Sequence, residues 1–455
     1  MAAPTAARRP SQTQPLELFS DLVTRALRRG ATAAEAMLVE GGAMSVSQRL
    51  GQREDMTRSE GREAGVRVFF GKQQAMASSS DLSPGALGDL LERVIVMAKA
   101  VPEEPYCGLA DSELLATDIP DLDLYDSHEP QAAELYERAA AAEDAARAVK
   151  GVTNSNGAGA SWSQGGLTLV TSGGFTGSMR WSAFEISTSV LAGSGTSMET
   201  DYATTSARFA ADLESAAAVG TEAGTRAVRR LDARKVDTAQ MPVVLEPRVS
   251  NMILGAFSGC INGQMIARGS SLLRDDMGKS VFGAGITIVD DPLRKRGLGS
   301  RPFDGEGVRQ TRRKLVDKGV LQTWILSTSD ALQLGLKTTG HASRGINTPP
   351  YPSPSNLYME PGSLTPAELM SDVGHGVYLT NVYGSGIDIV TGDVSLGAAG
   401  FLIENGEITV PVAGITIAGN LRDMFLHVTP ANDLIFRYGT DAPTLRVDGM
   451  TVAGN

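Results

Sequence analysis

Residues 402–408 read Leu-Ile-Glu-Asn-Gly-Glu-Ile, and residues 315–321 read Leu-Val-Asp-Lys-Gly-Val-Leu. In both stretches a two-residue turn, Asn-Gly or Lys-Gly, stands between short apolar runs, a pattern typical of a tight β-hairpin. Similar short apolar runs recur through the second half, where only Val249–Ile266 has the spacing of an apolar helix. Residues 239–455 are therefore predicted to form a largely antiparallel β domain.

The first half alternates between strand and helix patterns. Strands are predicted at Glu35–Val46, at Gly65–Phe70 and, in Ser/Thr/Gly-rich sequence, between 152 and 208, where glycine pairs are expected to mark hairpin turns. Predicted helices are 16–29, 83–100 (with Ser83 as N-cap), 134–150 and 209–231. The fold class is therefore α+β, with a mixed α/β N-terminal domain at residues 16–238.

The boundaries of this domain follow from composition. Ala239-Gln-Met-Pro242 precedes a fresh apolar strand and marks its end, and Val101–Pro130 is predicted to be a connecting loop. Residues 1–15 contain Arg8 and Arg9 without a following apolar run, so we expect a flexible tail and no secretory signal.

The charge balance narrows the function. Lys and Arg number 41 and Asp and Glu number 52, a net charge of −11. Such an acidic chain is a poor match for nucleic acid or for an anionic membrane surface, so neither is expected as a partner. The two cysteines, Cys107 and Cys260, form no disulfide or zinc framework and fit a reducing compartment, so a cytoplasmic location is expected.

The four histidines, His128, His341, His375 and His427, offer no metal motif. A helical zinc site needs two histidines on one helix face and a carboxylate nearby, and no two histidines here lie within one helical turn of each other. His427 is predicted to lie in a strand, Met424–Val428. His341 and His375 could meet only through the fold, which leaves open an independent hydrolase with a metal held by these two side chains and Asp residues.

A series of motifs in the second half carries a resemblance to a known family. In chain order they are Arg268-Gly-Ser-Ser-Leu-Leu273, Ile286-Thr-Ile-Val-Asp-Asp-Pro292, Gly297–Gly307, Leu334–Gly340, Thr391–Phe401 and Ile417–Asp423. This order resembles the TldD/PmbA family of bacterial proteins and, within it, the PmbA or TldE branch. The resemblance covers most of residues 240–455 and is looser in the first half.

The resemblance implies a subunit of a cytosolic TldD/TldE-type zinc metalloprotease complex that acts on peptides or unfolded segments. In the TldD branch, a helix carries a His-Glu-x-x-x-His motif and a later cysteine completes the zinc site. The equivalent helix here, Asn251–Met265, has no histidine and no carboxylate, and no cysteine follows Cys260. The chain is therefore expected to contribute no catalytic residue, no metal ligand and no cofactor of its own. Zinc is expected in a TldD-type partner, and a homodimer is expected when that partner is absent.

The candidate site residues are those that could line a peptide channel or form a partner loop. They are Gly299, Asp304, Glu306, Thr339, Gly340 and Ser395. For the glycine-rich segment that contains the first three, a tight structural turn is the alternative. The alternative function is a regulatory or binding protein without a proteolytic role, for example in the modulation of DNA gyrase or through a toxin–antitoxin pair.

Overall fold

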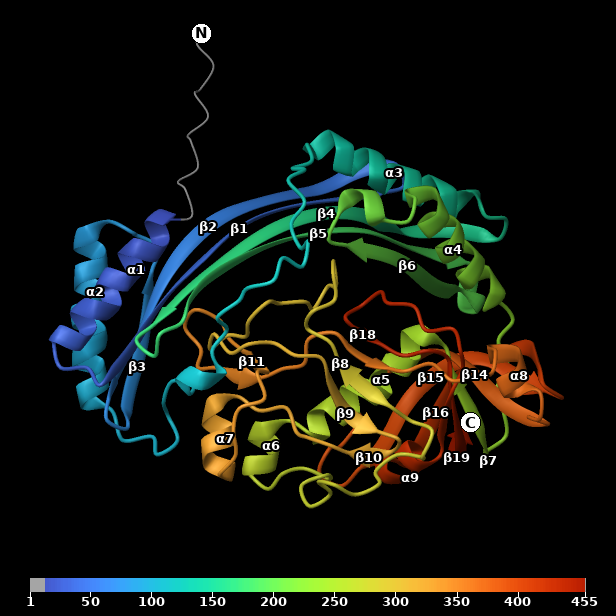
Figure 1. Cartoon of the computed structure of the whole chain (residues 1–455). Helices are drawn as coiled ribbons and strands as arrows, with labels where there is room; N and C mark the ends of the chain where they lie inside the picture. Colours follow the sequence, from blue (N-terminus) through green and yellow to red (C-terminus); the bar gives the residue numbers. More distant parts are fainter. Residues whose placement is uncertain (1–12, 455) are drawn as a thin grey trace, which may run out of the picture.

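The computed structural model describes residues 13–454, in which a long N-terminal sheet arches over a compact C-terminal half (Figure 1). The predicted tail, residues 1–15, lies mostly outside the described residues, and the first helix begins at Thr13. Among the described residues, no helix has the length and apolarity that a membrane span requires.

The arch is a six-stranded antiparallel sheet in the order β3-β2-β1-β4-β5-β6. Its strands are β1 Ala33–Arg49, β2 Gln52–Phe70, β3 Gln73–Ser79, β4 Val152–Thr171, β5 Thr176–Ala192 and β6 Glu199–Ala207. Four of these strands have 17 to 20 residues, well above the usual strand length of about 5–6 residues.

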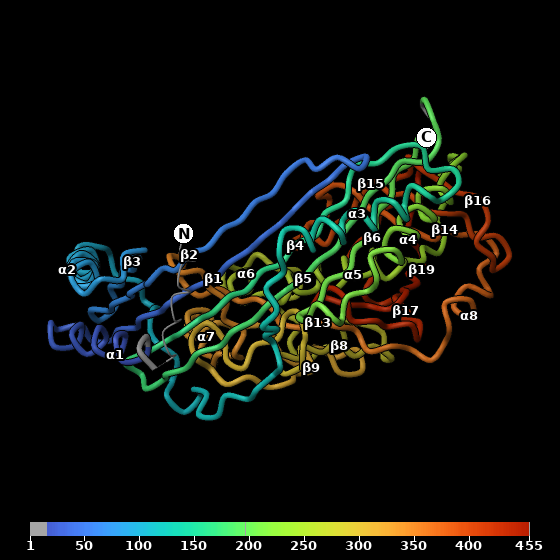
Figure 2. Tube along the Cα trace, turned by 90° about the horizontal axis from the view of Figure 1, so that it is seen from above, coloured from blue at the N-terminus to red at the C-terminus, as the bar shows by residue number. Residues whose placement is uncertain are grey.

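Two helix pairs cover the convex face of the sheet at its opposite ends (Figure 2). They are α1 Thr13–Arg28 with α2 Pro84–Ala100, and α3 Ala132–Ala148 with α4 Ala216–Arg229. Alternation along β1 explains the layers, since side chains two residues apart share a face. Ala36 and Leu38 pack in the core with α1 and α2, and Met44 and Val46 pack in the core with α3. Met37, on the other face, packs against the C-terminal half.

The segment between α2 and α3 runs through the predicted loop 101–130 with one short 3₁₀ turn, η1 Ser112–Leu114. Leu115 from this segment joins Phe175 of the N-terminal sheet region and Phe303 of the C-terminal half in a shared apolar cluster. The rings of Phe175 and Phe303 lie 4.8 Å apart between centroids. Two further 3₁₀ turns, η2 Gly195–Ser197 and η3 Ala210–Asp212, flank β6.

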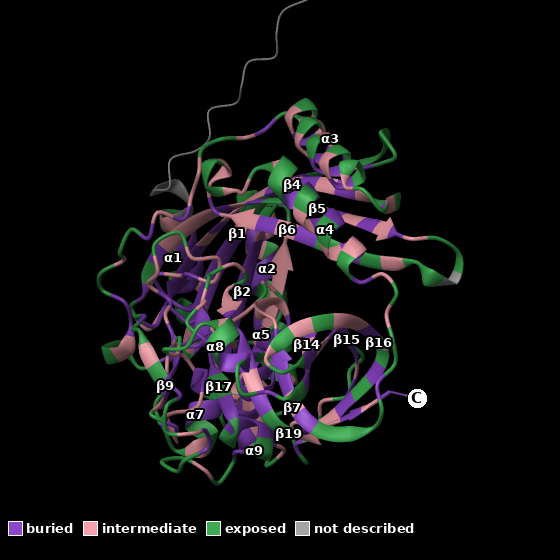
Figure 3. Cartoon of the chain, turned by 90° about the vertical axis from the view of Figure 1, so that its right-hand side faces the viewer, coloured by how far each residue is buried: buried purple, intermediate pink, exposed green. Residues whose placement is uncertain are grey.

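The C-terminal half is built on a closed ring of strands (Figure 3). β16 pairs with β15 on one side and with β19 on the other, which closes the order β16-β15-β14-β7-β19. The strands are β7 Ala239–Leu245, β14 His375–Tyr383, β15 Asp393–Glu404, β16 Glu407–Asn420 and β19 Leu445–Ala453, with β17 Val428–Pro430 added on β19. Only the β7–β14 pair in this ring is parallel.

A second sheet, in the order β10-β9-β8-β13-β18, completes the main core of this half. Its strands are β8 Ile288–Asp290, β9 Arg313–Asp317, β10 Val320–Leu321, β13 Leu357–Met359 and β18 Thr440–Asp441, and β11 Ala342–Ser343 pairs separately with β12 Tyr351–Pro352. The helices are α5 Pro247–Cys260, α6 Gly263–Ala267, α7 Thr328–Leu334, α8 Pro366–Met370 and α9 Leu421–Leu426. The fold is α+β, as predicted.

Both quoted hairpins are confirmed. Asn405 and Gly406 have φ of +52° and +85°, and Lys318 and Gly319 have φ of +48° and +82°, the left-handed pair that a two-residue type I′ turn requires.

Four local predictions were wrong. The helix predicted at 209–231 begins only at Ala216, because the Ser215 hydroxyl caps it by accepting from the Ala218 N–H. The predicted helix 249–266 is broken after Cys260, and Asn262 caps a new short helix. His427 follows α9 instead of lying in a strand, with Nδ1 2.8 Å from the Asp423 carbonyl.

The fourth concerns the glycine pairs expected to mark hairpin turns, a prediction that is right for one pair and wrong for the other. Gly165-Gly166 lies inside β4, whereas Gly173-Gly174 forms the turn to β5.

Candidate functional site: a cleft under the arch

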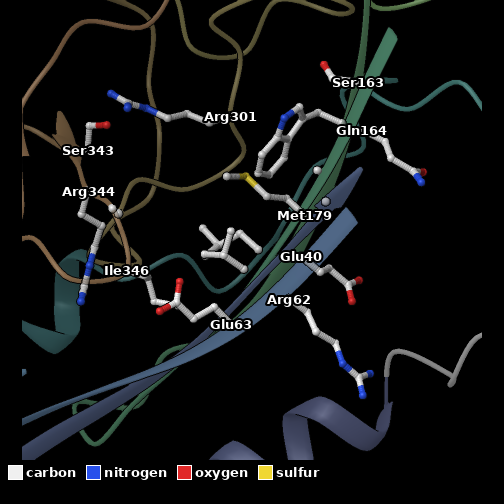
Figure 4. Close-up of a pocket in the computed structure, with 18 of the residues that line it drawn as sticks. Glu40, Arg62, Glu63, Ser163, Gln164, Met179, Arg301, Ser343, Arg344 and Ile346 are labelled. Atoms are coloured by element: carbon white, nitrogen blue, oxygen red, sulfur yellow. The ribbon is translucent and has the colours of Figure 1, made fainter. Parts of the chain in front are cut away.

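A cleft of about 720 Å³ lies between the concave face of the sheet and loops of the C-terminal half. In Figure 4, Met179 and Glu63 project from the sheet toward the loops that carry Arg301 and Arg344, while Glu40 projects on the opposite side of the strands. The lining also includes Leu167, Trp181, Phe303, Asp304, Ser343 and Ile346. The cleft is therefore largely apolar, with a few charged groups at its walls.

The floor of the cleft is a row of glycines across neighbouring strands. Gly61 of β2 pairs with Gly41 of β1, Gly41 pairs with Gly165 of β4, and Gly165 pairs with Trp181 of β5. Paired residues in an antiparallel ladder project to the same face, so three successive positions bear no side chain and the fourth bears an indole. The ring of Trp181 covers Gly165, where a Cβ atom would collide with it. The result is a shallow groove (the glycine groove) with Trp181 as its end wall.

One edge of the groove is an unpaired strand edge. β3 pairs with β2 only from Ala64 to Phe70, so within the described residues Gln52–Arg62 of β2 has a partner on one side alone. The strand-edge N–H and C=O groups next to Gly61 are the groups that bind an extended chain by strand addition.

Polar contacts connect the rim of the cleft to both halves of the molecule. Glu63 accepts a hydrogen bond from the Ser78 hydroxyl, and Asn347 Nδ2 donates to the same hydroxyl at 2.7 Å. Arg301 donates from Nη2 to the Ser353 carbonyl at 2.9 Å, and its buried Nε has no partner in the described structure.

Asp304 is the predicted site residue that lines the cleft, but its carboxylate is already occupied. It is 1% exposed and accepts hydrogen bonds from the N–H groups of Glu306 and Val308 at 2.9 Å and of Ala342 at 3.0 Å. Burial raises the pKa of Asp304 despite these bonds. Asp304 therefore fixes the turn that shapes the cleft wall.

Glu306 lies behind Asp304 and braces α7. Its Oε2 accepts from both the N–H and the hydroxyl of Thr328, at 2.9 and 2.8 Å. Burial and the neighbouring charge of Asp304 raise the pKa of Glu306 to about 8. The protonated form of Glu306 is therefore favoured, because two neighbouring buried carboxylates do not both ionise readily.

Thr339 and Gly340 belong to a buried network next to this turn. The Thr339 hydroxyl lies 2.8 Å from Nδ1 of His341, and Nε2 of His341 lies 3.3 Å from the Asp290 carboxylate. Burial by itself raises the pKa of Asp290, but hydrogen bonds from His341 and Ser355 outweigh it and lower the pKa. Gly340 accepts from Gln310 Nε2 at 2.9 Å through its carbonyl. His341 is 3% exposed, so this network is sealed from the cleft.

The remaining two predicted residues lie elsewhere. Gly299 packs so closely on the Ser355 backbone that a Cβ atom would collide with it, and its N–H donates to Asn356 Oδ1 at 2.9 Å. Ser395 is exposed on β15 in the barrel, away from the cleft. The six residues thus divide into a cluster of four, Asp304, Glu306, Thr339 and Gly340, and two positions outside it.

The helix α5 does not fit a zinc ion. It carries no histidine and no carboxylate, and its one thiol, Cys260, is fully buried, where burial raises the thiol pKa to about 12. Zinc is held by three or four protein ligands drawn from deprotonated thiolates, imidazoles and carboxylates. Within residues 13–454, no three His, Cys, Asp or Glu side chains form a group that could hold a metal. His341 and His375 do not form a site together, because His341 is sealed inside and His375 is exposed on β14.

The sequence reasoning missed the glycine groove and Trp181. A signal was present, since Gly41, Gly61 and Gly165 each interrupt a strand pattern, and glycine inside a strand often marks a close backbone approach. The register that aligns them across three strands is a property of the folded sheet.

An arched sheet over a closed barrel of strands, with a cleft between them, defines a two-part α+β protein. The domains of the PmbA/TldA metallopeptidases match this chain in order: domain 1 at residues 34–98, the central domain at 125–231 and the C-terminal domain at 238–454. The chain belongs to the PmbA/TldD family, in its PmbA branch.

Relatives span almost the whole chain. The metalloprotease PmbA of Escherichia coli O157:H7 is 36% identical over 423 residues, 92% of each chain. A PmbA homologue from Haemophilus influenzae is 36% identical over 450 residues, 98% of this chain and 97% of the relative.

Two solved structures share the fold. TldE from Thermococcus kodakarensis superposes with a TM-score of 0.82 at 16% identity, covering 96% of this chain and all of the other. A Bacteroides thetaiotaomicron protein, named as a candidate modulator of DNA gyrase, superposes with a TM-score of 0.89 at 24% identity, covering 98% of this chain and 100% of the other.

Proposed function

We propose that this chain is the non-catalytic, TldE-type subunit of a cytosolic two-subunit metallopeptidase. It pairs with a zinc-bearing TldD-type subunit and holds peptides or unfolded segments for cleavage there. The observation that carries the proposal is the composition of α5, which offers no imidazole, no carboxylate and only a sealed thiol. A relative named as a TldD homologue, 25% identical over 251 residues, supports a second family member as partner.

The cleft supports the peptide as ligand. A glycine groove beside a free strand edge exposes backbone groups to an extended chain without side-chain obstruction. The indole of Trp181 and the side chains of Met179 and Ile346 supply apolar contacts that do not depend on one peptide sequence. The residues that line the cleft include no histidine and no cysteine, so the lining offers binding groups without a histidine base or a thiol nucleophile.

The test is cleavage of an unstructured peptide by the chain alone, by a TldD-type subunit alone and by the two co-expressed. We expect no cleavage by the chain alone and faster cleavage by the pair than by the TldD-type subunit. Metal-dependent cleavage by the chain alone would contradict the proposal. An effect on gyrase supercoiling without any contribution to cleavage would favour the regulatory alternative.

A further inference from the structure

A second, smaller pocket has the charge of an anion site. It encloses about 200 Å³ where the end of β6 meets two loops of the C-terminal half, and it shares no lining residue with the cleft. Its lining holds five cationic side chains, Arg208, Arg294, Lys295, Arg296 and Arg437, and two carboxylates, Asp212 and Asp441. This excess of positive charge stands out in a chain whose net charge is −11.

Arg208 is a buried cation without an acidic partner. It is 8% exposed and donates from Nε to the Gly297 carbonyl at 3.2 Å, from Nη1 to the Ser182 carbonyl at 3.1 Å and from Nη2 to the Leu298 carbonyl. Burial lowers the pKa of its guanidinium to about 10. Neutral carbonyls hold this side chain in place, but they do not balance its charge.

The carboxylates of the pocket are already engaged. Asp441 accepts from the N–H groups of Arg437 and Tyr438 at 2.9 Å and of Gly439 at 3.1 Å. Asp212 pairs with Arg296 at 2.9 Å.

The cations of the pocket differ in whether they have a carboxylate partner. Arg437 pairs with Glu214 at 2.9 Å, outside the pocket lining. Among the described residues, no carboxylate lies within ion-pair distance of Arg208, Arg294 or Lys295. Arg294 lies over the ring of Phe436, with its guanidinium carbon 3.4 Å from the ring centroid.

We propose that this pocket binds an oxyanion, either a carboxylate or a phosphate group. Guanidinium and ammonium groups bind both by charge-assisted hydrogen bonds, and the volume accommodates one such group with a few waters. The carboxylate would come from a peptide and the phosphate from a free ion. Phe436 lines the pocket and is 39% exposed, so it offers an apolar contact to the rest of a larger ligand. The inference stands without the proposed peptidase role.

Calorimetric titration of the full chain at constant ionic strength tests this site. The probes are inorganic phosphate, a short peptide without acidic side chains that ends in a free carboxylate, and the same peptide with an amidated end. We expect one saturable site per chain for phosphate or for the free-acid peptide. The double variant Arg294→Gln/Lys295→Gln should bind at least about tenfold more weakly, because it removes two of the three lining cations that have no carboxylate within ion-pair distance.

The matched control is Lys150→Gln/Lys235→Gln, which removes two exposed positive charges outside the pocket. Its affinity should equal that of the unmodified chain, and thermal unfolding shows that both variants fold. Phosphate binding alone assigns the site to phosphate, and binding of the free-acid but not the amidated peptide assigns it to a carboxylate. Absence of saturable binding for phosphate and the free-acid peptide, or equal weakening in the control variant, overturns the proposal.

Discussion

Arg344, on the loop after β11, hydrogen-bonds the carboxylate oxygen of Glu35 on β1 that Arg67 also approaches at 3.2 Å. All three side chains are buried, with 4% of Arg344 and Arg67 and 2% of Glu35 exposed. Arg67 and Glu35 belong to the N-terminal sheet, whereas Arg344 belongs to a wall of the cleft. One carboxylate therefore joins the two halves where the cleft is formed.

Replacement of this carboxylate should destabilise the protein strongly. Glu35→Gln leaves two buried guanidinium groups without their shared counter-charge, and we expect a loss of about 3–5 kcal/mol in the free energy of unfolding. Urea unfolding measures this loss in the free energy of unfolding. The exposed control Glu17→Gln should change the free energy by no more than about 0.5 kcal/mol.

The same carboxylate has a pH signature. Burial raises the pKa of Glu35, but the two arginines lower it by more than burial raises it. The folded-state pKa therefore lies below the ordinary value of 4.5. The stabilisation is present above that value and is lost as pH falls through the folded-state pKa. In Glu35→Gln, stability should fall less steeply as the pH is lowered. An unchanged pH dependence would contradict the ion pairs of Glu35 with the two arginines.

Glu306 should act in the opposite direction. Its pKa of about 8 lies above the ordinary 4.5, so the unfolded chain releases this proton earlier than the folded one and stability falls as pH rises from about 4.5 toward 8. In Glu306→Gln the amide oxygen can still accept both bonds from Thr328, because both reach a single oxygen. The variant should unfold with a weaker pH dependence in this range, and a steeper one would refute the raised pKa.

Filling the glycine groove should impair peptide handling without unfolding the chain. A Cβ atom at Gly61 meets no other atom within 4 Å, so Gly61→Val is tolerated by the fold yet places a branched side chain on the groove floor. In the co-expressed pair we expect a KM at least about threefold higher with an unchanged Tm.

Gly85→Val, on α2 and equally open, is the control for this variant. Equal KM values in the two variants would remove the groove from peptide binding.

The isolated chain should contain less than one zinc per molecule. Neither α5 nor any other part of residues 13–454 gathers a group of ligands for it, and the Cys260 thiol stays protonated at neutral pH. Elemental analysis after desalting decides this, with a TldD-type subunit from the same preparation as the positive control. One tightly held zinc per chain would contradict the proposal that this chain is a non-catalytic subunit.

Without its partner, the chain should form a homodimer. Related subunits of one fold commonly pair through equivalent surfaces, so the surface that we propose for a TldD-type subunit would be available to a second copy. Light scattering at micromolar concentration should give about twice the chain mass of 47.7 kDa. A strict monomer that also fails to bind a TldD-type subunit would remove the shared surface.

Local chemistry explains which parts of the fold were predictable. The turns at Asn405-Gly406 and Lys318-Gly319 follow from the residues themselves, since glycine and asparagine adopt positive φ readily. The Ser83 cap of α2 has the same local origin. The helix start at Ser215 was missed because the residues just before it have the residue spacing of a helix but do not form an α-helix.

The candidate site was only partly predictable. The loop with Asp304 and Glu306 was singled out from its sequence, but only the fold shows that the buried Asp304 holds the turn of the cleft wall and that the buried Glu306 supports α7. The glycine groove pairs Gly41 with Gly165, about 120 positions further along the chain, and such a register depends on long-range pairing that no local pattern encodes.

The continuity of the arch decides how the cleft can respond to a ligand. Every residue of β1 from Glu35 to Gln48 pairs in unbroken register with β4 from Thr171 to Ala158, so no joint divides this ladder along its length. The 20 residues of β4 extend roughly 65 Å at about 3.3 Å per residue, so one continuous strand connects the regions covered by the two helix pairs. Because this ladder has no break, we expect the cleft beneath it to keep a nearly constant width and, under the proposed function, to take an extended peptide rather than a folded domain.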